Sequence, residues 1–138
     1  MSNGLKELRT MSGKVLIGTL WAMVALIGII SILHGGAVIV TGGLGIILAG
    51  SATLFWRHDP IGPLTRYISS SAVSAMVALL VLEFSHQPMQ IDMHMAFFAG
   101  LAIVAMWCCW MSILTAGAVV ALHHLVLNFV YPYAVFPE

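Results

Sequence analysis

Long apolar stretches separated by short polar interruptions make up most of this chain. A helix needs about 20 apolar residues to cross the roughly 30 Å hydrocarbon core of a bilayer. Stretches of about that length lie at residues 15–33, 37–56 and 67–85, and each ends at a glycine pair, a proline-containing loop or a polar turn. The pattern therefore predicts three membrane-spanning helices in the first part of the chain.

A fourth apolar run, residues 91–130, is too long for one crossing. As a single helix it would be about 60 Å long at 1.5 Å per residue, which is twice the membrane thickness. We place a turn at residues 107–112, because its two tryptophans favour the membrane interface and its serine can cap a helix. The run then becomes a fourth helix over about 92–107 and a fifth over about 112–130.

The predicted fold class is all-α, a polytopic membrane helix bundle with about five transmembrane helices. A transmembrane domain over residues 15–131 follows a cytoplasmic N-terminal segment, residues 1–14, and precedes an exit segment on the outer side, residues 132–138. The first half of the third predicted helix is rich in small residues, which let helix backbones approach closely, so we expect it to pack on a neighbour. These small residues are Ser69, Ser70, Ser71, Ala72, Ser74, Ala75 and Ala78.

The basic residues set the orientation of the predicted bundle. If successive segments alternate sides, all five basic residues fall on the side of the N-terminus, while Glu83, Asp92 and Glu138 fall on the other. Cytoplasmic loops are enriched in Lys and Arg, so the N-terminus is predicted to be cytoplasmic and the protein a multi-pass protein of a bacterial inner membrane. The five basic residues are Lys6, Arg9, Lys14, Arg57 and Arg66.

Composition supports a lipid environment and excludes some functions. The chain is 61% hydrophobic and only 7% charged, whereas soluble domains carry about 25% charged residues. Its formal net charge is zero, so it has no basic patch for nucleic acid. We also find no nucleophile–base pair and no phosphate-binding loop, so the sequence predicts no enzyme.

Five of the six histidines fall in the outer half of the predicted bundle: His34, His86, His94, His123 and His124. The adjacent pair near the end of the last helix lies about 10–12 Å below that end. Ionisable groups cost about 2.5–3.5 kcal/mol at the bilayer centre and less near the interface. Neighbouring helical residues point about 100° apart, so at least one histidine of the pair should face the bundle interior.

Carboxylates accompany these histidines. Glu83 and His86 are three residues apart, so we expect them to share a face of the third helix. Asp92 precedes His94 by two residues at the start of the fourth helix.

Methionines and an amide extend the candidate ligand set. Met93 and Met95 flank His94, and Asn128 lies one helical turn beyond His124. Imidazole suits zinc, copper and haem iron, and thioethers favour Cu(I), so copper and haem are the candidate cofactors. The ordinary alternative is that the histidines contact interfacial water and the methionines fill apolar space. The predicted ligand or metal-binding residues are His94, His123, His124, His86, Asp92 and Glu83, followed by His34, Met93, Met95 and Asn128.

The stretches 90–98 and 121–129 resemble the membrane input region of bacterial methyl-accepting chemotaxis proteins and related membrane sensors. Those regions carry an acidic residue, a histidine and aromatics, then an aromatic turn, then a histidine pair. The resemblance covers roughly residues 55–138 and implies a sensory input region, without specifying its ligand. The matching residues are Asp92, His94, Phe97, Phe98, Trp110, His123 and His124.

Two departures from that family stand out. Cys109 replaces an acidic residue of the turn, and the family continues into a sixth helix and a cytoplasmic signalling domain, whereas this sequence ends at Glu138. We therefore expect either a fragment of a longer receptor or a stand-alone relative that signals through a partner.

The function favoured by the sequence is a membrane-embedded sensory input module for chemotaxis-type signal transduction. It would bind a metal, haem or small ligand through the histidines, and would act as a homo-oligomer or with a signalling partner protein. The alternatives left open are a b-type haem or copper-binding subunit of a redox or transport complex, a metal carrier or accessory subunit, and a purely structural membrane protein.

Overall fold

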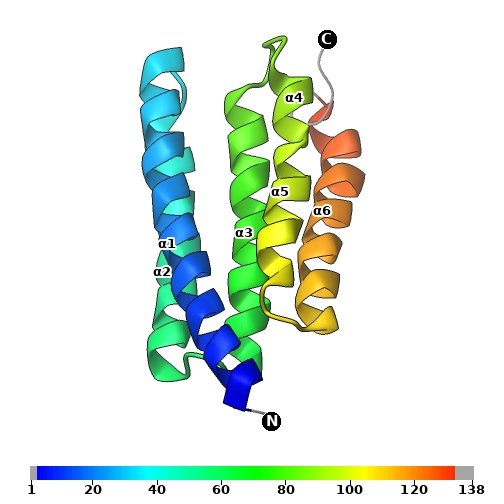
Figure 1. Ribbon diagram of the computed structural model, residues 1–138. Coiled ribbons are helices and arrows are strands. Elements are labelled where there is room, and N and C mark those ends of the chain that lie inside the picture. Colours follow the sequence, from blue (N-terminus) through cyan, green and yellow to red (C-terminus); the bar gives the residue numbers. More distant parts are fainter. Residues whose placement is uncertain (1–2, 133–138) are drawn as a thin grey trace.

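The computed structural model describes residues 3–132, and within that range the chain is helical and contains no strand. The chain runs the length of the bundle five times, with α4 and α5 together making the fourth pass (Figure 1). Helices α1, α2, α3 and α6 are each long and apolar enough to cross a membrane. The predicted helical class and order of passes are thus confirmed for the described residues. The elements are α1 (Asn3–His34), α2 (Val38–His58), α3 (Pro63–Glu83), α4 (Gln90–His94), α5 (Ala96–Ala105) and α6 (Trp110–Val130).

Helix α1 begins earlier than predicted. The sequence predicted a separate N-terminal segment over residues 1–14, but residues 3–14 belong to α1, which has 32 residues. Ser12 and Gly13 are already buried in this part, and a Cβ on Gly13 would lie only 2.8 Å from the Trp56 indole nitrogen. Packing on the other helices therefore keeps the start of α1 helical. At 1.5 Å per residue α1 is about 48 Å long, more than a bilayer core requires.

The fourth pass is not the single helix that the sequence predicted. At Met95 the backbone changes to the tighter i→i+3 bonding: the Met95 N–H donates to Asp92 O (3.0 Å) and the Phe98 N–H donates to Met95 O (3.1 Å). The pass is therefore divided into α4 and α5, and the ten residues of α5 rise only about 15 Å. Neither piece alone is long enough to cross a bilayer.

Helix α3 lies between the α1–α2 pair and the α5–α6 pair (Figure 1). It packs against all four of these helices and has the most buried surface of the long helices. The predicted packing of its small residues is confirmed. Its small buried residues are Thr65, Ser69, Ser70, Ala72, Val73 and Ser74.

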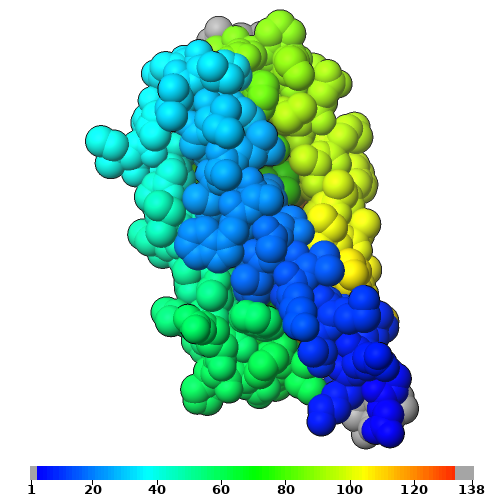
Figure 2. Space-filling view, turned by 60° about the vertical axis from the view of Figure 1, so that its left-hand side comes forward, coloured from blue at the N-terminus to red at the C-terminus, as the bar shows by residue number. Residues whose placement is uncertain are grey.

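The start of α1 is fastened to the turn after α5, and Figure 2 shows the two segments in contact. The Arg9 guanidinium donates to Trp107 O (3.1 Å) and Cys108 O (3.2 Å), and the Ser12 hydroxyl lies 2.8 Å from Met106 O. Carbonyls at a helix C-terminus lack helical partners and attract cations. Arg9 and Ser12 therefore satisfy the end of the short helix α5.

Trp107 is not the interfacial ring that the sequence predicted. Its side chain is fully buried, and its indole N–H donates to Ser69 Oγ on α3 (3.1 Å). The small residues of α3 leave room for the ring to turn inward, and Ser69 supplies the partner that a buried indole needs.

The two ends of the bundle differ in chemistry. The N-terminus, the α2–α3 turn and the α5–α6 turn lie at one end, called here the basic end, together with all five Lys and Arg residues (Figure 1). The α1–α2 turn, the α3–α4 turn and the end of α6 lie at the opposite end, called here the histidine end. The predicted segregation of basic residues is confirmed. Glu138 and most of the predicted exit segment lie outside the described residues.

Replacement of Trp107 by Ala should destabilise the bundle by about 3–5 kcal/mol, because it removes a fully buried ring and leaves a cavity. Trp110 is the matched control, since it is nearby in sequence but 73% exposed. Trp110→Ala should change stability by less than about 1 kcal/mol. Thermal unfolding in detergent measures both, and equal losses in the two variants would contradict the buried position of Trp107.

Candidate functional site

Three histidines and one phenylalanine of α4, α5 and α6 gather near the histidine end, where α5 packs on α6. The His94 and His124 ring centroids are 5.8 Å apart, and those of His123 and His124 are 5.1 Å apart. Phe97 lies 5.6 Å from His123 and 5.8 Å from His124 between ring centroids. We call these four side chains the imidazole cluster.

Two rings of the imidazole cluster are held in a defined tautomer. His94 Nδ1 lies 2.8 Å from Gln90 O, and His124 Nδ1 lies 2.8 Å from Val120 O, each one turn earlier in its own helix. A carbonyl oxygen can only accept, so each Nδ1 carries the hydrogen and each Nε2 presents its lone pair. Protein histidines that bind metals commonly have this support on the second nitrogen.

The Nε2 atoms of His94 and His123 are buried, and neither has a hydrogen bond with a described residue. A buried polar atom without a partner costs about 1–3 kcal/mol. His123 is the only histidine of the described chain whose whole side chain is buried. The imidazole cluster therefore offers acceptor nitrogens that the described protein does not use.

The imidazole cluster does not form a metal centre with three or more protein ligands. Among residues 3–132, no group of three or more His, Cys, Asp or Glu side chains is placed to hold a metal ion. The His94–His124 pair remains. Imidazole nitrogens bind zinc at about 2.0–2.1 Å, so two that share such an ion are at most about 4.2 Å apart. Ring centroids 5.8 Å apart are compatible with that separation.

The predicted pairing of Glu83 with His86 on one helix face is wrong. Helix α3 ends at Glu83, and His86 has a left-handed backbone (φ 64°) in the following turn, where its side chain is exposed. Glu83 is instead buried against the α1–α2 turn, where a Cβ on Gly36 would meet its carboxylate at 2.7 Å. The structure thus separates this carboxylate from the imidazole cluster.

His34 also lies outside the imidazole cluster. Its Nδ1 is 3.1 Å from the Gln87 amide nitrogen and 3.4 Å from the main-chain oxygen of Glu83, and its ring packs edge-on against Phe84 at 5.2 Å. His34 therefore joins the end of α1 to the end of α3.

The remaining predicted ligands do not converge on the imidazole cluster. Asp92, Met95 and Asn128 are exposed, and Met93 is half-buried against the apolar core. Sequence reasoning placed Phe97 only in the family resemblance, although its spacing of three residues from His94 was a usable signal. Gln90 was missed because it orients His94 through its main-chain oxygen, and every residue type carries such an oxygen.

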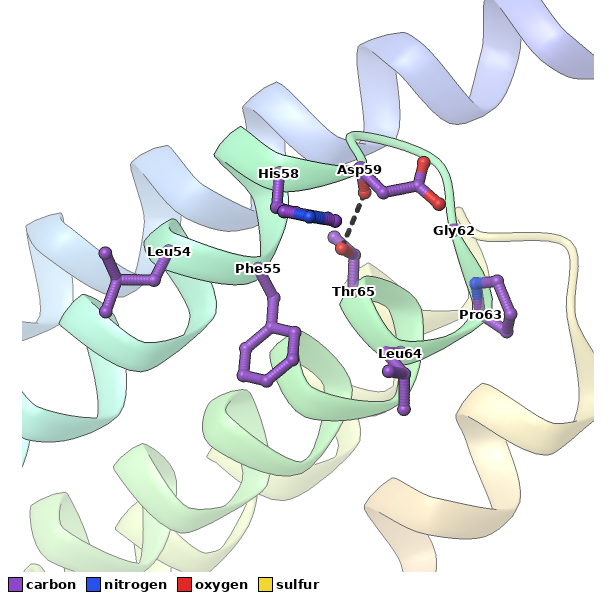
Figure 3. A pocket seen from close by; sticks show the side chains of 8 residues that line it. All are labelled: Leu54, Phe55, His58, Asp59, Gly62, Pro63, Leu64 and Thr65. Carbon is purple, nitrogen blue, oxygen red and sulfur yellow. Dashed lines mark hydrogen bonds between the residues drawn. The ribbon is translucent and has the colours of Figure 1, made fainter.

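A cavity of about 440 Å³ lies at the basic end, far from the imidazole cluster. Figure 3 shows His58 beside Thr65 among its lining residues, and the Thr65 hydroxyl donates to Asp59 O (2.6 Å). The walls are mostly apolar, and only His58 and Asp59 are ionisable. We assign no chemistry to this cavity. Its lining residues are Leu54, Phe55, His58, Asp59, Gly62, Pro63, Leu64 and Thr65.

Two free cysteines form the α5–α6 turn at the basic end, and Cys109 is the N-cap residue of α6. Burial acts to raise the pKa of the Cys109 thiol, but the neighbouring polar groups of Ser112 and Met111 and the nearby charge of Arg66 outweigh it and lower the pKa. The Cys109 thiolate therefore forms at a lower pH than an ordinary thiol.

Comparison with known proteins finds no family model that matches this chain, and no curated protein or solved structure that is significantly similar. The resemblance to chemotaxis input regions therefore remains a prediction from the motif residues alone.

Alkylation should report the lowered pKa of Cys109. In a Cys108→Ser variant only Cys109 reacts, and because the thiolate is the nucleophile, its rate with iodoacetamide should be half-maximal at lower pH in the folded chain than in the unfolded chain. An unchanged midpoint on unfolding would contradict the assigned environment.

Proposed function

We propose that this chain is a membrane-embedded sensory input module whose ligand binds between His94 and His124. The observation that carries the proposal is the arrangement of these two rings. Each Nδ1 is held by a carbonyl of its own helix, and the ring centroids, one on α4 and the other on α6, are 5.8 Å apart. The ligand is a centre that accepts imidazole lone pairs, and a soft ion such as Cu(I) or a haem iron has that chemistry.

A bilayer position is supported by α6. Only Ser112, Ala116 and His123 of its 21 residues are buried, while large apolar side chains such as Phe129 and Leu125 are exposed. Such a surface suits lipid or a neighbouring copy of the chain. The basic end is proposed to face the cytoplasm, following the positive-inside rule.

The helix contacts offer a route from the ligand to the basic end. A ligand that draws His94 toward His124 moves α4 and α5 relative to α6. The far end of α5 is held by Arg9 and Ser12 of α1, so a shift of α5 is passed to the start of α1. A ligand biases such a shift only if it binds the two arrangements with different affinity. A homo-oligomeric contact or a signalling partner at the basic end would read the movement.

The test is ligand binding to the detergent-purified chain, with Cu(I) under reducing conditions and haemin as separate probes. We expect stoichiometric binding of one probe, followed by elemental analysis for copper or by the Soret band for haem. His94→Ala and His124→Ala should each weaken binding at least about tenfold, since each removes a ligand.

His58→Ala is the matched control, because His58 is an exposed histidine at the opposite end. It should bind the probe like the unaltered chain. Equal binding by His94→Ala, His124→Ala and His58→Ala would remove the His94–His124 pair from the proposal. Failure of both probes to bind the unaltered chain would remove the metal and haem classes.

Labelling of Cys108 should test the orientation. Its thiol is exposed at the basic end, so a membrane-impermeant maleimide should modify a Cys109→Ser variant in inverted inner-membrane vesicles and not in intact spheroplasts. Solubilised membranes provide the control for full reactivity. Labelling from the outside would reverse the proposed topology.

A further inference from the structure

A second polar group lies at the histidine end, between the ends of α1 and α3 and the start of α2. At its centre is Glu83, whose side chain is only 9% exposed. Its Oε1 is buried and receives no hydrogen bond from any described residue. Ionisable side chains at membrane depth are costly unless something compensates them.

No lysine or arginine of the described chain lies near Glu83. All five Lys and Arg residues lie at the basic end, and Arg66, on the same helix as Glu83, is about 25 Å away at 1.5 Å per residue. The nearby His34 ring contacts the main-chain oxygen of Glu83 and the Gln87 amide. Neither contact reaches the carboxylate.

The Ser31 hydroxyl lies beside the carboxylate, and the Thr41 hydroxyl, which also lies 3.2 Å from Ala37 O, is next to that of Ser31. An added Cβ on Gly36 would lie 2.7 Å from Glu83 Oε2 and 2.9 Å from Ser31 Oγ, so both oxygens converge beside this glycine. Ser31 Oγ is in turn 3.5 Å from Thr41 Oγ1. Ser31 and Thr41 are both buried. The nearest atoms around this point are therefore the oxygens of Glu83 and Ser31.

The helix termini add to the local negative potential. Helices α1 and α3 end here, at His34 and Glu83, and each C-terminus carries about half a negative charge. The N-terminus of α2 at Val38 offsets one of them. One formal negative charge, oxygen donors and a helix C-terminus together suit a monovalent cation, as at sodium sites built from helix ends in membrane proteins.

We propose that Glu83, Ser31 and Thr41 form a binding site for one sodium ion. Gly36 is part of the site because its missing side chain lets the carboxylate approach the α1–α2 turn. The site shares no residue with the imidazole cluster, so it stands independently of the proposed function.

Direct binding of ²²Na⁺ to the purified full chain tests the proposal, with choline chloride holding the ionic strength constant. We expect saturable binding that unlabelled NaCl displaces. Glu83→Gln should weaken it at least tenfold, since the variant keeps the shape of the side chain and removes its charge. Ser31→Ala should weaken it less. Asp92→Asn, which neutralises an exposed carboxylate at the same end, should leave it unchanged.

Gly36→Ala supplies a second test that leaves the charge in place. Its Cβ would displace the carboxylate or the Ser31 hydroxyl, so ²²Na⁺ binding should fall, whereas Gly42→Ala should bind normally because a Cβ there meets no atom within 4 Å.

Thermal unfolding gives an independent readout that also shows whether each variant is folded. Replacing choline by saturating sodium should raise the midpoint of the unaltered chain by roughly 5 °C and leave that of Glu83→Gln unchanged. Equal ²²Na⁺ binding by a folded Glu83→Gln variant would overturn the site. Absence of saturable binding by the unaltered chain, or a midpoint that does not respond to sodium, would overturn it too.

Discussion

Close approach at α3 is the constraint on which the rest of the bundle depends. In lipid, apolar helices gain little by burying one another, so they associate where small side chains let backbones pack closely. Helix α3 provides that surface with residues such as Ser70 and Ala72, and α1, α2, α5 and α6 all pack on it. The same surface leaves room for Trp107, whose indole N–H bonds to Ser69 and so holds the α5–α6 turn inward.

Much of the fold could be predicted because most of the apolar runs have the length that a membrane-spanning helix needs. Helices α2, α3 and α6 begin and end within a few residues of the expected positions, since glycine, proline and charged residues mark their turns. The start of α1 was missed because hydropathy detects the apolar run, whereas the helix begins in the polar residues before that run. The break at Met95 was missed because no glycine or proline marks it in the sequence.

The sequence predicted at which end of the bundle the candidate residues lie, but not which helix each side chain faces. Alternation of the passes placed His34, Glu83, His94 and His124 at one end, and the structure agrees. Which helix each side chain faces depends on how α1, α2 and α6 are arranged around α3, and sequence position does not contain that arrangement. Glu83 consequently meets Ser31 on α1 and not a histidine of α6.

The two polar sites at the histidine end are linked by one short connection. Residues 84–90 begin at the ring that packs on His34 and end at the carbonyl that orients His94. A ligand that fixes the α3 end at Glu83 therefore restricts the same segment that positions His94. By thermodynamic linkage, each ligand would alter the affinity for the other only if this segment differs between the two bound states. Measuring copper or haem affinity with and without sodium would give the size of that coupling directly.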